Sequence, residues 1–332
     1  MRRALTTAST ACAAFLAATA VAHADTYTVT GVGDGSGSCQ LIQVSLHECT
    51  TLRAAVTAAN ASAGVEDAIA LPAGTITLAQ GPLDLSDDVA IAGSGARLSS
   101  VVAAPSARTF RILNSAQVML TGFTVARGNA NNEDGGNLVV STGSLLSLVA
   151  MRVTGGIARA GAGILNQGTT AIQYSVLDDN TATTVGGAVD SLSPGGGEAS
   201  LFIFNSTLAE NTAAGSGAAI ASHGEGANAV TLVHATVARN EGHAIWMQHA
   251  QDTAAQASIL GPNTGVNCDP ISGGQPFETG SWNVDSAATC GLGGTTNRQN
   301  ANPLIAAALS NEGGPTNVLT IAAGSPAVNL VA

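Results

Sequence analysis

The chain contains 332 residues, of which 40 are glycine, 3% are aromatic and only 10% are charged. Globular domains average about a quarter charged residues, so this composition argues against a helical bundle. All 11 basic residues are arginine, and 22 carboxylates against them leave a formal net charge of −11. Because nucleic-acid binding needs a basic patch, this charge argues against a nucleic-acid partner.

The first 24 residues have the three parts of an export signal. Met1-Arg2-Arg3 is positively charged, Ala13 to Val21 is apolar, and Ala22-His23-Ala24 is a small-x-small cleavage site. The apolar run is too short for a membrane-spanning helix, and no later stretch of about 20 apolar residues follows. We therefore expect a protein without a membrane span that is secreted, either extracellular or held at the cell surface, with a mature chain starting near Asp25.

Four cysteines remain after removal of the signal, and they form two local pairs, Cys39 with Cys49 and Cys268 with Cys290. Export permits disulfides. Four cysteines allow three connectivities, but the long separation between the two pairs favours local bridges. A zinc site is disfavoured because C-x-x-C spacings are absent.

One segment near the amino terminus has the pattern of a helix. We expect it over residues 51–63, with Thr50 or Thr51 as the N-cap and Gly64 as the stop. From Ala68 onward the pattern changes to strand alternation, with apolar residues at every second position and Pro or Gly between the runs.

The middle of the chain repeats. Five segments share a Gly-x-small-aliphatic pattern, and their leading glycines are 26, 25, 31 and 25 residues apart. The long interval contains a surface-loop insertion around Pro194. An apolar strand that ends in a polar turn precedes four of the segments, and a weaker copy, Arg152-Val153-Thr154-Gly155-Gly156, precedes the segment at Gly161. The segments are Gly135-Gly136-Asn137-Leu138, Gly161-Ala162-Gly163-Ile164, Gly186-Gly187-Ala188-Val189, Gly217-Ala218-Ala219-Ile220 and Gly242-His243-Ala244-Ile245.

A period near 25 residues, rich in Gly, Asn and β-branched residues, predicts an all-β parallel solenoid in which each coil buries its apolar face on the next. The predicted helix would cap the amino-terminal end. Aligned columns should become rows along the axis. The first inward row consists of Leu138, Ile164, Val189, Ile220 and Ile245. The second inward row consists of Leu120, Leu148, Ile172, Ile203 and Leu232. A corner row of residues that tolerate positive φ, with stacked Asn amides, is Gly128, Gly156, Asn180, Asn211, Asn240.

We therefore divide the chain into four parts. Residues 1–24 are the signal, 25–65 a disulfide loop with the capping helix, 66–260 the parallel β-helix, and 261–332 its last coils and carboxy-terminal cap.

Several motifs resemble those of a known group of exported proteins. Cys49-Thr50-Thr51-Leu52-Arg53-Ala54-Ala55 resembles the CSLREA motif that opens many bacterial β-helix proteins. Asp179-Asn180-Thr181-Ala182 and Glu210-Asn211-Thr212-Ala213 are similar to polymorphic outer-membrane protein repeats, and Asn311-Glu312-Gly313-Gly314-Pro315-Thr316 and Gly324-Ser325-Pro326-Ala327-Val328-Asn329 resemble the choice-of-anchor Q region. The resemblance implies a right-handed parallel β-helix at or outside the cell surface, and it implies no single reaction; a pectate-lyase-like architecture belongs to the alternative of an extracellular polysaccharide-degrading enzyme.

The residue before each corner forms the first candidate site. Asp179 and Glu210 would lie on adjacent coils about 5 Å apart, a separation suited to retaining glycoside hydrolysis. Arg239 is the third candidate catalytic residue, although it would also neutralise Glu210. The alternative is a solvated face of alternating charges. The absence of Lys excludes a lysine base, and an arginine-based lyase remains open.

A second candidate site binds substrate. Trp246 follows an inward residue, so its ring should face outward as a sugar platform, and His243 lies three residues before it. Four histidines gather in the last clear coils without a metal-binding spacing: His223, His234, His243 and His249. The loops 34–38 and 131–134 carry oxygen ligands that calcium prefers, and we expect no other cofactor.

These observations support two hypotheses for function. The first is a monomeric exported β-helix that binds a polysaccharide or another surface or matrix ligand in adhesion, without catalysis. The alternative is an extracellular polysaccharide lyase or glycoside hydrolase. A flat face of Thr, Ser, Asn and Ala favours binding, whereas a groove with clustered carboxylates or arginines would favour an enzyme.

Overall fold

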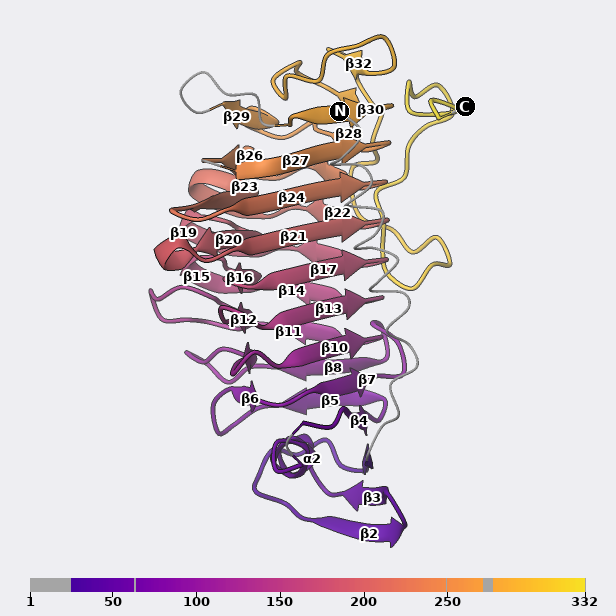
Figure 1. Cartoon of the computed structure of the whole chain (residues 1–332). Coiled ribbons are helices and arrows are strands. Elements are labelled where there is room, and N and C mark those ends of the chain that lie inside the picture. Colours follow the sequence, from indigo (N-terminus) through magenta and orange to yellow (C-terminus); the bar gives the residue numbers. More distant parts are fainter. Residues whose placement is uncertain (1–24, 63, 249, 271–276, 332) are drawn as a thin grey trace.

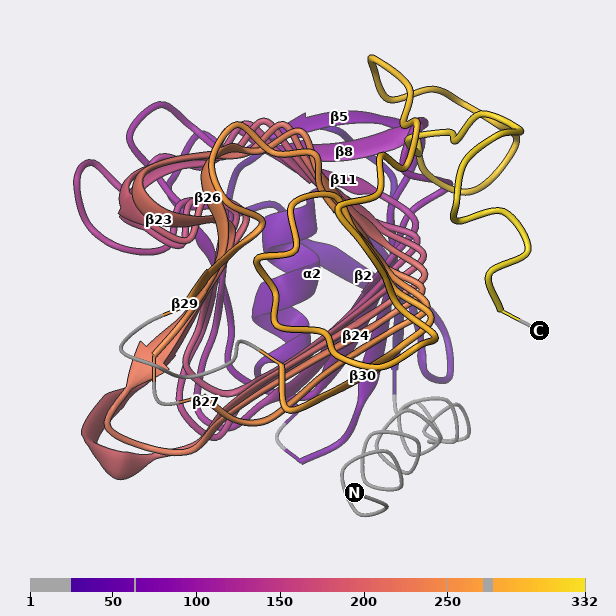
Figure 2. The ribbon, with the colours of Figure 1, turned by 90° about the horizontal axis from the view of Figure 1, so that it is seen from above.

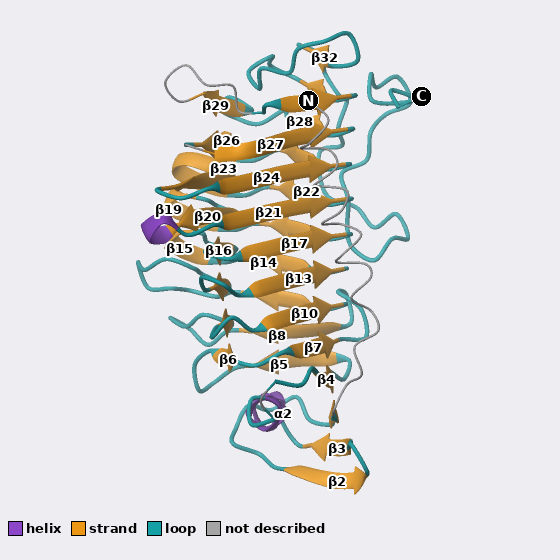
Figure 3. Ribbon diagram, in the orientation of Figure 1, coloured by secondary structure: helices purple, strands orange, loops and turns teal. Residues whose placement is uncertain are grey.

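The structure is a computed structural model that describes residues 25–62, 64–248, 250–270 and 277–331. The predicted export signal lies outside the described residues. Figure 1 shows a stack of coils in which strands of successive coils lie one above another, and Figure 3 shows that strands and loops make up nearly all of the stack. The chain is therefore a parallel β-solenoid, as predicted from the repeat. In the described part of the chain, no helix is long and apolar enough to cross a membrane.

Three sheets run along the solenoid. Sheet A contains, in spatial order, β2 (Cys39–Gln43), β3 (Leu46–Cys49), β1 (Thr26–Val29), β4 (Asp67–Ala70), β7 (Val89–Ala92), β10 (Gln117–Thr121), β13 (Leu145–Val149), β17 (Thr169–Gln173), β21 (Ala199–Phe204), β24 (Asn228–Val233), β27 (Ala250–Gln256) and β30 (Thr279–Ser281). Sheet B contains β5 (Gly74–Thr77), β8 (Ser99–Val102), β11 (Thr124–Ala126), β14 (Arg152–Thr154), β18 (Val176–Asp178), β22 (Thr207–Ala209), β25 (Thr236–Ala238), β28 (Ile259–Leu260), β31 (Val284–Asp285) and β32 (Arg298–Gln299).

Sheet C forms the third side of the solenoid, and part of it is irregular. Its regular strands are β6 (Leu83–Leu85), β9 (Phe110–Ile112), β12 (Leu138–Val140), β16 (Ile164–Asn166), β20 (Val189–Ser193), β23 (Thr212–Gly224), β26 (Glu241–Met247) and β29 (Cys268–Pro270). Beside them, β15 (Ile157–Ala160) pairs with β19 (Thr181–Val185), and β19 pairs with the first part of β23. A short 3-10 turn, η2 (Pro194–Gly196), occupies the predicted insertion.

The predicted register is confirmed. Leu138, Ile164, Val189, Ile220 and Ile245 are paired in succession and are fully buried. The second inward row, from Leu120 to Leu232, is likewise paired and buried. The core therefore consists of aliphatic rows that run along the solenoid axis.

The backbone conformation explains why each repeat begins with glycine. All five have positive φ, from 63° at Gly161 to 114° at Gly242, a region that L side chains rarely adopt. At the following position, a Cβ on Gly187 would lie only 2.3 Å from the carbonyl oxygen of Ala218. Small residues here permit adjacent coils to approach closely.

The corner row forms the predicted ladder of amides. The Nδ2 group of Asn180 donates to Oδ1 of Asn211 at 2.9 Å, and Asn211 donates to Asn240 at 3.0 Å. All three side chains are fully buried. The expectation that the corner row itself takes positive φ was wrong, because positive φ falls one residue earlier. The residues that adopt it are Arg127, Gly155, Asp179, Glu210 and Arg239. That turn directs each Asn side chain inward, where its amide satisfies backbone groups of neighbouring coils.

The predicted capping helix is present but shorter than expected. Helix α2 spans Leu52–Ala59, and the hydroxyl of its N-cap Thr51 accepts a hydrogen bond from the Ala54 N–H at 3.1 Å. Its end is set by Asn60, whose side chain donates to the Asp84 carbonyl and accepts from the Ser86 N–H of a neighbouring coil. Seen along the axis in Figure 2, α2 lies across the amino-terminal opening of the solenoid.

Both predicted disulfides are present. Cys39 is bonded to Cys49 and holds the β2–β3 hairpin at the amino-terminal end, whereas Cys268 is bonded to Cys290 among the last coils. Each bridge therefore closes a short loop next to one end of the stack.

Residues 300–331, here called the C-terminal strap, leave the stack and run back along sheet B (Figures 1 and 2). The guanidinium of Arg97 donates to the Gly314 carbonyl at 2.6 Å, and the Thr316 hydroxyl donates to the Tyr174 carbonyl at 3.2 Å. Leu319 packs on Ala209 and Ala238, which are fully buried. The strap therefore covers part of the outer face of sheet B.

Candidate functional site

The outer face of sheet C carries a row of chemically diverse side chains. Strand register places one residue of each coil directly above the last, and this row is here called the C-face row. From the amino-terminal end it contains Asp84, Arg111, Val139, Leu165, Asp190, Ala221, Trp246 and Asp269. These side chains point away from the core because they alternate with the buried aliphatic rows.

Trp246, a predicted substrate-binding residue, lies on β26 in this row. Its ring is half-buried, and its centroid lies 5.1 Å from that of His223 at a tilt of 44°. Figure 2 shows β26 and β29 on the side of the solenoid away from the strap. The ring therefore has a fixed neighbour and a partly open surface.

His223 is held by a carboxylate that sequence reasoning missed. Its Nε2 lies 2.9 Å from Oδ1 of Asp190, and Asp190 is only 1% exposed. Burial raises the pKa of Asp190, although the hydrogen bond and charge of His223 act in the opposite direction. The signal was available in the register, because Asp190 is a charged residue between Leu165 and Ala221 in an otherwise apolar part of the row.

His243, the other predicted substrate-binding residue, forms a second histidine–aspartate pair. Its Nδ1 lies 2.9 Å from Oδ2 of Asp269, and the Ser216 hydroxyl donates to the same oxygen at 2.9 Å. Ser216 and His243 thus share one acceptor, so this arrangement is not a serine–histidine–aspartate relay, in which the histidine would accept from the serine. Asp269 also follows Trp246 in the row. The indole is consequently bracketed by two histidine–aspartate pairs.

The three predicted catalytic residues lie elsewhere. Asp179, Glu210 and Arg239 follow strands of sheet B, at the corner where the asparagine ladder begins. Asp179 Oδ2 lies 4.0 Å from the Arg152 guanidinium, and Glu210 Oε1 lies 3.6 Å from Arg239 Nε. Burial and the charge of Asp178 raise the pKa of Asp179, and Arg152 opposes them. Each carboxylate therefore has a cationic neighbour, as expected for an alternating charged face.

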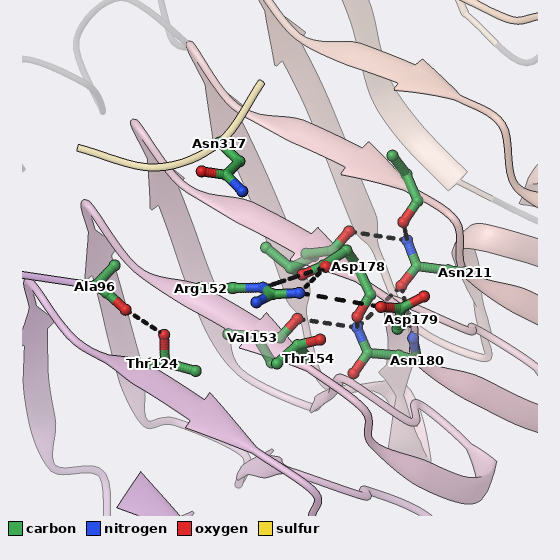
Figure 4. A network of polar contacts seen from close by, with 12 residues as sticks. Ala96, Thr124, Arg152, Val153, Thr154, Asp178, Asp179, Asn180, Asn211 and Asn317 are labelled. Carbon is green, nitrogen blue, oxygen red and sulfur yellow. Dashed lines mark hydrogen bonds and ion pairs between the residues drawn. The ribbon is translucent and has the colours of Figure 1, made fainter. Parts of the chain in front are cut away.

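The strongest ion pair near this corner joins Arg152 and Asp178. Arg152 Nε donates to Asp178 Oδ1 at 2.9 Å, and Nη2 donates to Oδ2 at 2.5 Å. Figure 4 shows this pair beside Asn180 and Asn211, with Asn317 of the strap nearby. Asp178 is 1% exposed. This pair stabilises a covered surface, and we assign it no role in binding.

The two predicted calcium loops have their carboxylates engaged by arginine. Asp34 accepts from Arg53 Nε at 2.7 Å and from two backbone N–H groups. Burial raises the pKa of Asp34, but the hydrogen bond from Arg53 and those backbone bonds outweigh it, so the pKa is lowered. Asp134 pairs with Arg159 at 2.5 Å. Among the described residues, no group of three or more His, Cys, Asp or Glu side chains is arranged to hold a metal ion.

Of the other two histidines of this group, only His234 lies among the described residues. His234 lies at the corner after sheet A, at the same position as Tyr174 and Asn205 in earlier coils, as the alignment predicted. His249 lies outside the described residues.

Comparisons with known proteins give little guidance. No family model matches the chain, and no curated protein matches it. Among solved structures, ORF18 of Geobacillus virus E2 aligns with a TM-score of 0.38 and 12% sequence identity, over 67% of this chain and 49% of that one. The chain thus spans about half the length of the viral protein.

Proposed function

We propose that the chain is an exported β-helix protein that binds a glycan on the outer face of sheet C, and that it acts in adhesion at the cell surface or in the surrounding matrix. One observation carries this proposal: the half-buried Trp246 lies between the Asp190–His223 and Asp269–His243 pairs. Sugars are recognised by stacking of their C–H faces on an aromatic ring together with hydrogen bonds from polar side chains held in place. The two pairs supply such groups on either side of the indole.

Other features support the cellular location. The predicted export signal and two disulfides suit an oxidising compartment. The motifs that resemble the CSLREA, polymorphic outer-membrane protein and choice-of-anchor Q proteins agree with a β-helix at or outside the cell surface. We therefore place the glycan outside the cell that makes the protein.

The test is a glycan array followed by calorimetry with the mature protein and two variants. Trp246→Ala should weaken binding of any glycan found by at least about tenfold, because the stacking surface is lost. Tyr174→Asn is the matched control, since Tyr174 is an exposed aromatic residue at a corner where Asn205 stands one coil later. Equal affinity for the Trp246→Ala variant would contradict the site. Absence of binding to every glycan would contradict the function.

A second candidate function is cleavage of an extracellular polysaccharide. It is favoured by the raised pKa of the buried Asp190 carboxyl and its hydrogen bond to His223, since such a pair is able to exchange protons with a bound sugar. Assays for new reducing ends and for unsaturated products would detect hydrolysis and elimination respectively. Turnover that disappears in Asp190→Asn and His223→Gln but persists in Asp179→Asn would support this alternative; binding without turnover would exclude it for the sugars tested.

A further inference from the structure

The first described residue of the chain contacts a buried carboxylate. The backbone nitrogen of Asp25 lies 2.9 Å from Oδ1 of Asp67, whose side chain is fully buried. The strand register explains this approach, because β1 pairs with β4 from Thr26 opposite Ala68, and the Ala68 N–H donates to the Asp25 carbonyl at 2.9 Å. Asp25 and Asp67 therefore lie opposite each other at the amino-terminal end of the solenoid.

Asp67 has weaker partners than the other buried aspartates. Its Oδ2 accepts a hydrogen bond from the Ser62 hydroxyl, and its Oδ1 accepts from the Asp25 nitrogen. In the part of the chain that the structure describes, no arginine or histidine forms an ion pair with Asp67. The other buried aspartates have either a cationic side chain or three N–H donors: Asp178, Asp190 and Asp285.

A second carboxylate makes the surroundings of Asp67 more negative. The side chain of Asp25 accepts a hydrogen bond from the Tyr27 hydroxyl at 3.5 Å, and its Oδ1 lies 3.6 Å from His47 Nε2. Burial and the charges of Asp67 and Asp25 raise the pKa of Tyr27 to about 12. A buried carboxylate without a cationic partner is unfavourable. A positive charge at the Asp25 nitrogen would supply that partner.

The amino-acid sequence predicts such a charge at this nitrogen. The small-x-small motif Ala22-His23-Ala24 ends immediately before Asp25. The peptidase that removes export signals would hydrolyse the Ala24–Asp25 peptide bond, so that the hydroxyl of water joins the Ala24 carbonyl carbon and a proton joins the Asp25 nitrogen. The resulting α-amino group takes a further proton from solvent and is mostly charged at neutral pH. Processing thus converts a neutral amide beside Asp67 into an ammonium group.

We propose that removal of the export signal after Ala24 creates an ammonium group that forms a buried ion pair with Asp67 and completes the amino-terminal cap of the solenoid. The Asp67 carboxylate of β4 contacts Asp25 at the start of β1 and Ser62 after α2, so it joins three segments of the cap. Hydrogen bonds between charged groups are about twice as strong as those between neutral ones. The ion pair requires the predicted export signal but is independent of the glycan site, so it goes beyond the proposed function.

The position of cleavage is the first test. Mass spectrometry of the protein that a bacterial host exports after expression of the full chain should identify Asp25 as the first residue. A different first residue would overturn the ion pair and leave export intact. Recovery of the uncleaved chain alone would overturn both the ion pair and the predicted signal.

Urea unfolding measures the contribution of the charge. One form of the protein begins at Asp25, a second retains Ala24, and a third begins at Asp25 but is acetylated at its α-amino group while unfolded and then refolded. Retaining Ala24 moves the ammonium group by about 3.8 Å, the distance between consecutive Cα atoms, and acetylation removes the charge. Both changes should raise the unfolding equilibrium constant at least about tenfold, because Asp67 loses its cationic partner. Equal stability of the free and acetylated forms would overturn the proposal.

Two carboxylate variants locate the effect. In Asp67→Asn, acetylation should change the unfolding equilibrium constant by less than about twofold, because the ammonium group has no carboxylate to pair with. Asp87→Asn is the matched control, since Asp87 is a partly exposed carboxylate nearby that accepts from the Gly64 N–H. This control should keep the full effect of acetylation. An equal effect of acetylation in both variants would contradict the pairing with Asp67.

Amine labelling gives a readout that does not require either variant to fold. The chain contains no lysine, so the α-amino group is the single primary amine of the mature protein. An amine-reactive ester should modify the folded form that begins at Asp25 at least about tenfold more slowly than the folded form that retains Ala24, because the paired ammonium group must first leave Asp67 by local opening. Equal labelling rates would overturn the ion pair, whatever the outcome of the glycan experiments.

Discussion

Sheets B and C present two outer faces built from the same coils, and the chain treats them in opposite ways. On sheet B, the outward Ala209 and Ala238 are fully buried beneath Leu319 of the C-terminal strap. On sheet C, the corresponding surface carries Trp246, whose side chain stays partly open. The repeats build an outer face on each side of the solenoid. The C-terminal strap covers part of the sheet B face and leaves the sheet C face accessible to a ligand.

Buried charge differs between the two faces as well. Asp178, on the outer face of sheet B, accepts hydrogen bonds from Nε and Nη2 along one edge of the Arg152 guanidinium, an arrangement that stabilises the carboxylate. Asp190 on sheet C has a single histidine partner, and burial raises its pKa. A fully paired carboxylate holds a structure together, whereas an incompletely paired one retains the capacity to exchange a proton or bind a ligand.

The comparison predicts the largest loss of stability at the ion pair of sheet B. Arg152→Met should lower the free energy of unfolding by about 3 kcal/mol, because it leaves the buried Asp178 carboxylate without a partner. Arg159→Met removes an exposed pair from the sheet C side and should cost less than about 1 kcal/mol. Urea denaturation measures both, and equal losses would refute the distinction between the faces.

Removing the contact that covers sheet B should have the next largest effect. Leu319→Ala should lower the free energy of unfolding by about 2 kcal/mol, the lower end for a buried leucine, because this side chain packs on only a few alanines. The exposed Leu304 of the same segment provides the control, and Leu304→Ala should change stability by less than about 0.5 kcal/mol. A larger effect at Leu304 than at Leu319 would show that the strap is held elsewhere.

The free energy of unfolding should depend on pH through Asp190 on sheet C, with a defined sign. Its pKa in the folded protein is raised above the ordinary value of 3.8, so the folded state binds a proton more readily than the unfolded state. Its contribution to stability is therefore fully present below about 3.8 and is lost as pH rises through the folded pKa. As pH rises across this interval, the free energy of unfolding of the wild type should fall relative to that of the Asp190→Asn variant. Denaturation series at several pH values measure the difference, and the opposite slope would contradict the burial of a weakly paired carboxyl group.

The smallest effect is expected at the exposed corner. Glu210→Gln breaks only the pair with Arg239 at 3.6 Å, so the free energy of unfolding should fall by no more than about 0.5 kcal/mol. Glycan affinity should not change. A marked loss of affinity in this variant would move the binding site from sheet C to the corner row.

Much of the scaffold could be predicted from the sequence because its determinants are periodic. The repeats that begin at Gly161 and Gly186 have the same length to their aliphatic residue, and Ile164 therefore lies beside Val189 in the stack. The helix end was less predictable, since it depends on hydrogen bonds from Asn60 to a neighbouring coil.

The site was predicted only in part, for a physical reason. Residue type and position in the repeat suffice to propose Trp246 and His243 as candidates, and their binding of substrate stays a prediction. Asp190 was missed although the register places this charged residue between Leu165 and Ala221, because its burial and its contact with His223, 33 residues later, do not follow from residue type.

The C-terminal strap has a consequence for how the molecule unfolds. A stack of repeats normally has contacts only between neighbours, so it is able to fray progressively from an end. Here the bonds from Arg97 to Gly314 and Asn317 join positions 217 and 220 residues apart, and Thr316 fastens the same segment to Tyr174 in the middle of the stack. Loosening the central coil that carries Tyr174 therefore also weakens the contact of the same segment with Arg97, in an early coil. This bracing should make the molecule open more cooperatively than a solenoid of equal length without it, with slow and nearly uniform amide hydrogen exchange across the braced coils.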